Sequence, residues 1–126
     1  MQKAAAAARV AVLGASPKED RYSFKAVRML REHGYTPIPV HPAGHTVDGI
    51  IGVKSLGGID EAVDTLTVYV NSRTSQGEKE RMLALAPRRV IFNPGAENQE
   101  LAAELGTAGI EVVRACTLVM LRTGQF

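Results

Sequence analysis

The chain has 126 residues, enough for one domain with a sizeable core and too few for two ordinary domains. Hydrophobic residues make up 45% and charged residues 22% of it, which is close to average usage and argues against both disorder and a membrane protein. The formal net charge of +2 is too small to indicate a nucleic-acid partner, although it leaves room for an anionic small ligand. We therefore expect a single domain over residues 1–126.

Cysteine and histidine content favours a reducing, cytoplasmic location. The only cysteine, Cys116, cannot form an internal disulfide, and three scattered histidines do not complete a zinc site. The opening Lys3 and the alanines after it resemble a signal peptide, but Arg9 interrupts that run and cleavage would remove the first strand. We expect residues 1–8 to form a flexible or helical lead-in, and no stretch approaches the length of a membrane-spanning helix.

Apolar runs and helical spacing alternate along the chain. Short apolar or β-branched runs predict strands at residues 9–14, 35–40, 66–70, 89–92 and 110–113. Apolar residues at helical spacing predict helices at residues 24–33, 76–86 and 101–108, and a further turn of helix is expected around Cys116. Between the second and third strands we expect a glycine-rich segment over residues 43–58, with a short extended stretch at 53–56, followed by one helical turn at 59–63.

Capping residues set the expected helix ends. Ser23 is the expected N-cap of the first helix, and Ser75, with Glu78 at capping-box spacing, is that of the second. Gly34 and Gly109 are expected to end the first and third helices in the left-handed conformation.

Alternating strands and helices predict an α/β, three-layer, doubly wound Rossmann-like fold with a mainly parallel five-stranded sheet. In such a sheet, ligands bind outside the carboxyl ends of the strands, where the strand order reverses. The loops to inspect are therefore residues 14–23, 39–43, 71–75 and 93–96. Taken singly, each has the composition of an ordinary strand-to-helix connection.

The first loop departs from the fingerprint of dinucleotide-binding sites. Gly14 matches the first glycine of Gly-x-Gly-x-x-Gly, but Ser16 and Glu19 occupy the second and third positions. His41 stands at the end of the second strand, where an acidic residue would bind the ribose of NAD. A conventional NAD site is therefore not indicated.

Phosphate binding is the chemistry that the first loop favours. Ser16, Lys18, Arg21 and Ser23 can form charge-assisted and neutral hydrogen bonds to phosphate, alongside backbone N–H groups. Arg73, just after the third strand, adds positive charge at the same edge or is simply a solvated surface residue.

Catalytic and metal sites are not evident. Cys116 has apolar neighbours, which favours a small buried residue over a nucleophile, and no acid–base pair emerges from the spacing of the carboxylates. His41 and His45 are four residues apart, but Pro42 and Gly44 between them argue against a helical pair of metal ligands. We therefore predict no catalytic residue and no metal ligand, with His41 a candidate to touch a ligand.

Five short motifs follow one another along the chain. They are residues 10–16, 34–42, 68–71, 92–97 and 109–113, the last of which leads to Cys116. This series resembles the family of small stand-alone CoA-binding proteins, which are similar to the N-terminal CoA-binding domain of the succinyl-CoA synthetase alpha subunit. The resemblance covers nearly the whole chain after residue 9. It implies a Rossmann-type sheet with CoA, or an acyl-CoA, across its carboxyl edge. The phosphohistidine chemistry of the synthetase resides in a later domain, so the resemblance implies binding and no reaction.

The resemblance also implies which residues contact the ligand. Gly14, Ala15 and Ser16 would meet the phosphates with help from Lys18, Arg21 and Ser23; Pro39, Val40, His41 and Pro42 would border the adenosine; and Val70, Asn71, Asn93, Pro94, Gly95 and Ala96 would line the pantetheine path. Two positions depart from the family pattern. Ala43 stands where a basic residue often follows the strand-two proline, so a contact to the 3′-phosphate is weaker or comes from elsewhere. Ala115 interrupts the Asp-Arg-Cys pattern before Cys116.

Three functions remain open from the sequence. The first is a cytoplasmic CoA or acyl-CoA binding protein, with a small-molecule nucleotide ligand and neither nucleic acid nor membrane as a partner. The second is an enzyme acting on a nucleotide or thioester through Cys116 or His41. The third is a regulatory or interaction protein that kept the fold and lost the ligand. A homodimer is possible through the apolar tail at residues 118–121.

Overall fold

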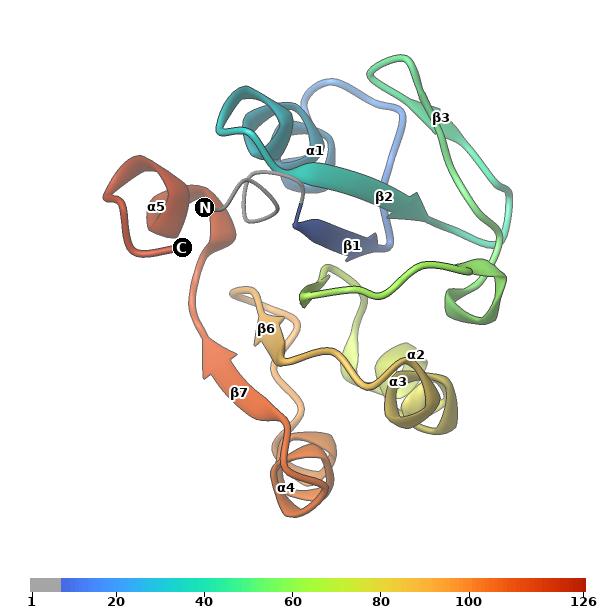
Figure 1. The fold of residues 1–126 in the computed structure, drawn as a ribbon, viewed down its shortest axis with the longest axis vertical. Helices are drawn as coiled ribbons and strands as arrows, with labels where there is room; N and C mark the ends of the chain where they lie inside the picture. The colour runs from blue at the N-terminus through green and yellow to red at the C-terminus, as the bar shows by residue number, and fades with distance from the viewer. Residues whose placement is uncertain (1–7) are drawn as a thin grey trace.

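A central parallel sheet organises the computed structural model, which describes residues 8–126 (Figure 1). The strands lie in the order β2-β1-β5-β6-β7, and each neighbouring pair is parallel. Their bounds are β1 (Arg9–Leu13), β2 (Thr36–Val40), β5 (Thr65–Val68), β6 (Arg89–Phe92) and β7 (Glu111–Arg114). The expected α/β fold with a five-stranded parallel sheet is therefore confirmed.

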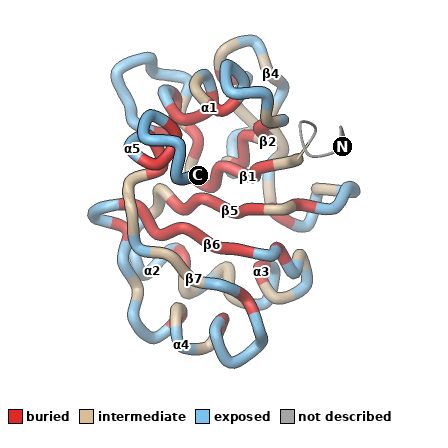
Figure 2. The backbone as a smooth tube through the Cα atoms, turned by 60° about the vertical axis from the view of Figure 1, so that its left-hand side comes forward, coloured by how far each residue is buried: buried red, intermediate tan, exposed pale blue. Residues whose placement is uncertain are grey.

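Helices cover both faces of this sheet. On one face lie α1 (Tyr22–Glu32) and α5 (Thr117–Arg122), and on the other lie α2 (Ser72–Gln76), α3 (Lys79–Leu85) and α4 (Gln99–Thr107). Strand β1 shows why both faces must be covered, because its side chains alternate between two cores. Val10 and Val12 pack with the α1 face, whereas Ala11 and Leu13 pack with the α3 and α4 face. Strands β1, β5 and β6 are buried along most of their length, while the edge strand β7 is half exposed (Figure 2).

A small hairpin occupies the long connection between β2 and β5. Strands β3 (Thr46–Val47) and β4 (Ile50–Ile51) pair antiparallel, and a 3-10 turn, η2 (Leu56–Gly58), follows them. Asp48, at the hairpin tip, accepts hydrogen bonds from Arg28 at 3.0 Å and from Arg31, both on α1. These ion pairs hold the tip of the hairpin against the helix.

Helix starts are where the sequence-based expectations were wrong. The helix expected at residues 76–86 begins three residues later, as α3, and a separate short helix, α2, precedes it, with Gly77 and Glu78 between the two. Ser75 caps neither helix. Asn71 caps α2, since its Oδ1 accepts the N–H of Thr74 at 2.9 Å, and α3 begins after Glu78 without a side-chain cap. Ser75 is buried inside α2, where its hydroxyl donates to the carbonyl of Ser72 at 3.1 Å.

The first helix and the segment before β5 need similar corrections. Helix α1 begins at Tyr22, so Ser23 lies inside its first turn and Arg21 occupies the N-cap position. The helical turn expected at residues 59–63 is absent from the described chain, and the nearest helical turn is η2. Gly34 and Gly109, by contrast, follow α1 and α4 with φ of +89°, as expected.

The first residues of the chain lie outside the part that the structure describes. The lead-in predicted for residues 1–8 falls outside the described residues except for Ala8, whose carbonyl accepts the N–H of Thr36 at 2.9 Å. The single domain over residues 1–126 stays a prediction. Between residues 8 and 126, no helix is long and apolar enough to cross a membrane.

Candidate ligand-binding site

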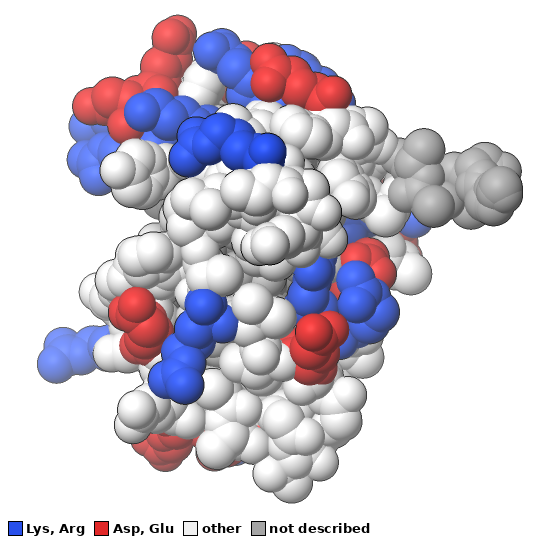
Figure 3. All heavy atoms as spheres, turned by 90° about the vertical axis from the view of Figure 1, so that its left-hand side faces the viewer, with Lys and Arg blue, Asp and Glu red and all other residues white. Residues whose placement is uncertain are grey.

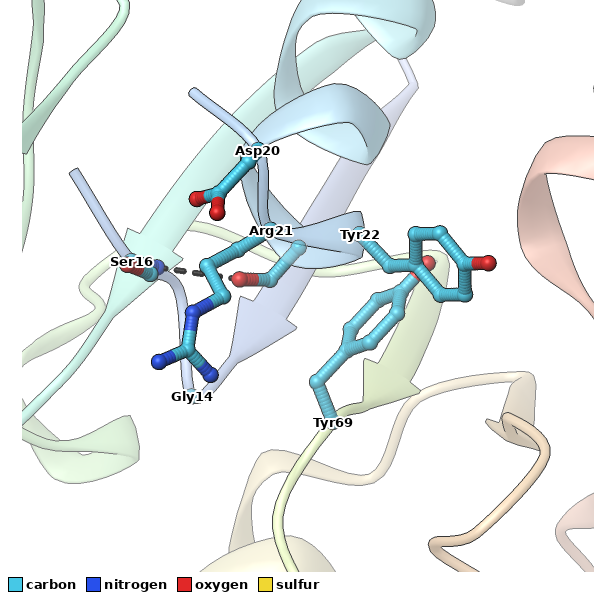
Figure 4. A pocket seen from close by; sticks show the side chains of 7 residues that line it. Gly14, Ser16, Asp20, Arg21, Tyr22 and Tyr69 are labelled. Atoms are coloured by element: carbon cyan, nitrogen blue, oxygen red, sulfur yellow. Dashed lines mark hydrogen bonds between the residues drawn. The ribbon is translucent and has the colours of Figure 1, made fainter. Parts of the chain in front are cut away.

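The strand order reverses at β1, because the chain leaves β1 for β2 on one side of it and later returns to β5 on the other. Loops at the carboxyl ends of β1 and β5 therefore diverge and leave a crevice, the usual ligand site of open α/β sheets. A pocket of about 390 Å³ opens at this point (Figure 4). Its lining consists of Gly14, Ser16, Asp20, Arg21, Tyr22, Ser23 and Tyr69. A hollow of the same volume lies between η2 and α3, so the position in the topology, and not the volume, singles out the first pocket.

Gly14 makes the turn out of β1 possible. Its φ is +88°, and a Cβ placed on it would lie 2.7 Å from Cγ1 of Val70. The N–H groups of Gly14 and Ala15 both donate to the carbonyl of Val40, at 2.8 and 3.2 Å. The loop after β1 is therefore joined directly to the end of β2.

Two serines shape the rest of this loop. The N–H of Ser16 donates to the Ser23 hydroxyl at 3.0 Å, and the N–H of Lys18 donates to the Ser16 hydroxyl at 3.1 Å. Each hydroxyl acts here as an acceptor, so its own proton is still free to be donated to a ligand. Lys18 itself is exposed and does not line the pocket.

The start of α1 faces the pocket with free donors. Arg21, at the N-cap, has extended backbone and makes no side-chain cap. The amides of Tyr22, Ser23 and Phe24 find no acceptor among residues 8–126. Unpaired first-turn amides and the positive end of the helix dipole favour an anion. The Arg21 side chain extends toward Gly14 and adds a full positive charge (Figure 4).

Two tyrosines that the sequence did not single out complete the pocket. Tyr69 follows β5, and its hydroxyl is buried with no hydrogen-bond partner in the described part of the chain. Burial raises the pKa of Tyr69 to about 12, so the phenol stays neutral and is a hydrogen-bond donor. Tyr22 lies beside it at the mouth and is 64% exposed.

The turn after β2 lies next to this pocket without lining it. Val40 is buried and contributes its carbonyl to the loop after β1, while the carbonyl of Pro39 accepts the N–H of Val53 at 2.9 Å. His41 Nδ1 accepts the N–H of Ala43 at 3.0 Å, and the His41 ring lies 4.4 Å from that of His45. Burial, and next the proximity of His45, lower the pKa of His41. Pro42 follows in the same turn.

The third predicted loop forms the start of α2. Val70 packs against the turn at Gly14, and the Asn71 side chain is occupied in capping the helix. Arg73 lies exposed on the first turn of α2 and is absent from the pocket lining.

The fourth predicted loop is built around a buried amide. Asn93 donates to the Thr67 hydroxyl at 2.6 Å and to the Val68 carbonyl at 2.9 Å, and its Oδ1 accepts the N–H of Thr117 at 2.9 Å. The side chain thus joins β5, β6 and α5. Pro94 and Gly95 are exposed, Gly95 with a φ of +89°, whereas Ala96 is buried.

Cys116 differs from its sequence-based expectation. It was expected to be buried, but it is only partly buried and occupies the N-cap position of α5. No hydrogen bond joins its thiol to a base within residues 8–126. In the apolar tail that follows, Leu118, Met120 and Leu121 are buried and Val119 is 46% exposed. The face that carries α5 and β7 bears few charged side chains across its middle (Figure 3), and the homodimer stays a prediction.

The fold and the pocket define a Rossmann-like domain with a crevice at the switch point of its sheet. Comparison with known proteins identifies the class further, because the family model described as "CoA binding domain" matches residues 8–122. The chain therefore belongs to the CoA-binding domain family, which confirms the resemblance seen in its sequence motifs.

Individual relatives match most of the chain in sequence and in fold. The uncharacterized protein YneT of Bacillus subtilis (strain 168) is 32% identical over 108 residues, covering 83% of this chain and 78% of YneT. A solved structure of an uncharacterized protein is 42% identical with a TM-score of 0.90, covering 95% of this chain and 98% of that one. The structure of cell-free ID.343 from Thermus thermophilus is 33% identical with a TM-score of 0.86, covering 97% of this chain and 92% of that one.

Proposed function

We propose that this chain is a CoA or acyl-CoA binding protein that holds the ligand's diphosphate in the pocket between the loop after β1 and the start of α1. The observation that carries the proposal is the meeting of Arg21 and the unpaired first-turn amides of α1 at the switch point of the sheet. Membership of the CoA-binding domain family supports the choice of CoA among nucleotides.

The residues around the pocket suit the separate parts of CoA. The protons of the Ser16 and Ser23 hydroxyls and the charge of Arg21 complement the diphosphate. In the proposed arrangement the adenosine lies toward residues 39–42, and the pantetheine runs along residues 70–71 and 93–96. The partly exposed thiol of Cys116 has no hydrogen-bonded base among the described residues, so the proposal includes binding and no reaction.

NAD fits the same crevice less well. A site for NAD places a carboxylate at the end of the second strand to accept hydrogen bonds from the ribose hydroxyls. His41 stands there instead, and its Nδ1 is already used by the N–H of Ala43. We therefore expect CoA to bind and NAD to leave the protein unchanged.

Thermal unfolding with CoA tests the proposal. A ligand at about 100 times its dissociation constant adds about 2.7 kcal/mol to the free energy of unfolding, which raises the Tm measurably. Arg21→Gln should weaken CoA binding about tenfold or more, because a hydrogen bond to a charged group is lost. Arg122→Gln, in the last turn of α5, is the matched control and should bind like the wild type. An unchanged Tm for folded wild-type protein in millimolar CoA overturns the proposal.

A further inference from the structure

Asp20 places a negative charge in the pocket that we propose for a diphosphate. Its side chain lines that pocket together with Ser16, Arg21 and Ser23. Figure 4 shows the Asp20 carboxylate directed toward the hydrogen bond between Ser16 and Ser23. The Arg21 guanidinium is directed toward Gly14 instead. The pocket therefore has a basic side at Arg21 and an acidic side at Asp20.

The Asp20 carboxylate has no cation of its own in the described part of the chain. No ion pair within residues 8–126 includes it, although Asp48 and Asp64 are each held by arginines. Asp20 is exposed, so water solvates its charge while the pocket is open. A ligand that fills the pocket displaces part of this water, and the carboxylate then needs another partner.

A diphosphate alone cannot be that partner. Ionised carboxylates and phosphates offer only acceptors of hydrogen bonds, and their like charges repel one another. Arg21 and the unpaired first-turn amides of α1 donate to phosphate oxygens on their own side of the pocket. On the side of Asp20, a cation must lie between the carboxylate and the phosphates if both are to be held at close range.

We infer that Asp20 and the diphosphate of the ligand together bind a divalent cation of the Mg²⁺ kind. Mg²⁺ takes oxygen ligands, keeps several of its waters, and is usually held by one or two carboxylates together with substrate phosphates. Asp20 supplies the carboxylate and the ligand supplies the phosphate oxygens. The inference rests on the proposed function and adds a metal ion to it.

A cation shared in this way leaves no motif in the sequence. Metal motifs are sets of protein side chains, and within residues 8–126 no three His, Cys, Asp or Glu side chains are grouped so that they could hold a metal ion. A cation that takes most of its ligands from phosphate and water requires only one of them. We therefore expect Mg²⁺ to bind with the ligand and only weakly to the protein alone.

Calorimetric titration of the full chain with CoA, in MgCl₂ and in EDTA, tests the inference. The wild type should bind CoA about fivefold or more tightly in millimolar MgCl₂, the usual size of coupling between two bound ligands. Asp20→Asn keeps the shape of the side chain and removes its charge. In this variant the effect of Mg²⁺ should fall below about twofold, and CoA should bind in EDTA at least as tightly as to the wild type.

Linkage supplies a second measurement, because CoA must raise the affinity for the metal by the same factor. Mn²⁺ is the probe, since it accepts the same oxygen ligands and its free form is counted by electron paramagnetic resonance. Mn²⁺ should bind to the wild type in the presence of CoA. It should bind more weakly to the wild type without CoA and to Asp20→Asn with CoA.

Glu19→Gln is the matched control, because it removes the same charge from the same loop at an exposed residue that does not line the pocket. It should keep the full effect of Mg²⁺. Dephospho-CoA should show this effect as well, because it lacks the 3′-phosphate and keeps the diphosphate.

Three results overturn the inference and leave the proposed function standing. They are equal affinity of the wild type for CoA in MgCl₂ and EDTA, an undiminished effect of Mg²⁺ in Asp20→Asn, and loss of the effect in Glu19→Gln or with dephospho-CoA. If CoA binds the folded wild type in neither buffer, the proposed function fails and the inference fails with it.

Discussion

Replacing Gly14 with alanine tests the geometry of the turn that supports the pocket. Gly14 and Gly34 have nearly the same left-handed backbone, with φ of +88° and +89°. Their surroundings differ. A Cβ on Gly14 would lie 2.7 Å from Cγ1 of Val70 and 3.3 Å from the carbonyl carbon of Tyr69, whereas a Cβ on Gly34 would have no neighbour within 4 Å.

The two substitutions therefore separate backbone strain from a steric clash. A left-handed alanine costs about 1–2 kcal/mol, and this strain is common to Gly14→Ala and Gly34→Ala. The loss of unfolded-chain entropy is also the same in both variants and cancels between them. Gly14→Ala adds overpacking against Val70 and the backbone after β5, which costs about 1–3 kcal/mol more. We expect a total of about 2–5 kcal/mol for Gly14→Ala.

Urea denaturation of the two variants and the wild type measures this difference. Gly14→Ala should unfold at a clearly lower urea concentration than Gly34→Ala, with the same dependence of the free energy on urea. It should also weaken CoA binding, because the loop that holds the phosphates must shift to make room. Equal stability of the two variants would refute the steric argument and show that Val70 moves aside without cost.

Three further outcomes follow from the described contacts. Asn93→Leu leaves the buried N–H of Thr117 without its acceptor and should lower the free energy of unfolding by about 2–4 kcal/mol in urea; a loss under 1 kcal/mol would contradict this. Asp48→Ala removes both ion pairs to α1 and should speed amide hydrogen exchange at residues 46–51 while exchange in β1 is unchanged. Burial, and next the proximity of His45, lower the pKa of His41 in the folded protein. Below about pH 6.5 the unfolded chain therefore binds a proton at His41 more readily than the folded chain does. Stability should therefore fall as the pH drops through 6.5, and His41→Gln should reduce that fall.

The sheet was predictable because its strands are buried on both faces and read as continuous apolar runs. Strand β6 has the predicted bounds, and the predicted first strand differs from β1 only by including Gly14. The edge strand β7 lies one residue later than predicted, with exposed residues at both ends and only partial burial between them. Strand bounds were therefore predicted best for strands that are buried along their whole length.

Helix starts were less predictable because several side chains can cap the same helix. Ser75 and Glu78 have the spacing of a capping box, but Ser75 lies inside α2. That helix is capped four residues before Ser75, by Asn71, whose side chain accepts the N–H of Thr74. The chain then turns at Gly77, and α3 begins without a side-chain cap at Glu78. Sequence spacing identifies the residues that are able to cap a helix. The path of the chain after β5 decides which of these residues forms the cap.

The candidate site was only partly predictable for a related reason. Loop composition predicted Ser16, Arg21 and Ser23, because polar loops that follow parallel strands all lie at the carboxyl edge of the sheet. Tyr69 lacked such a signal. It reaches the pocket through the pairing of β5 with β1, which is a contact between segments far apart in the sequence.

The carbonyl of Val40 adds a second long-range contact to the site. By accepting the N–H groups of Gly14 and Ala15, it fixes the loop after β1 to the end of β2. The loop and the strand end therefore form one rigid edge of the crevice, and a ligand that contacts both need not order two separate loops on binding. The same turn brings Gly14 close to Val70, so a side chain at position 14 should disturb the fold and the crevice together.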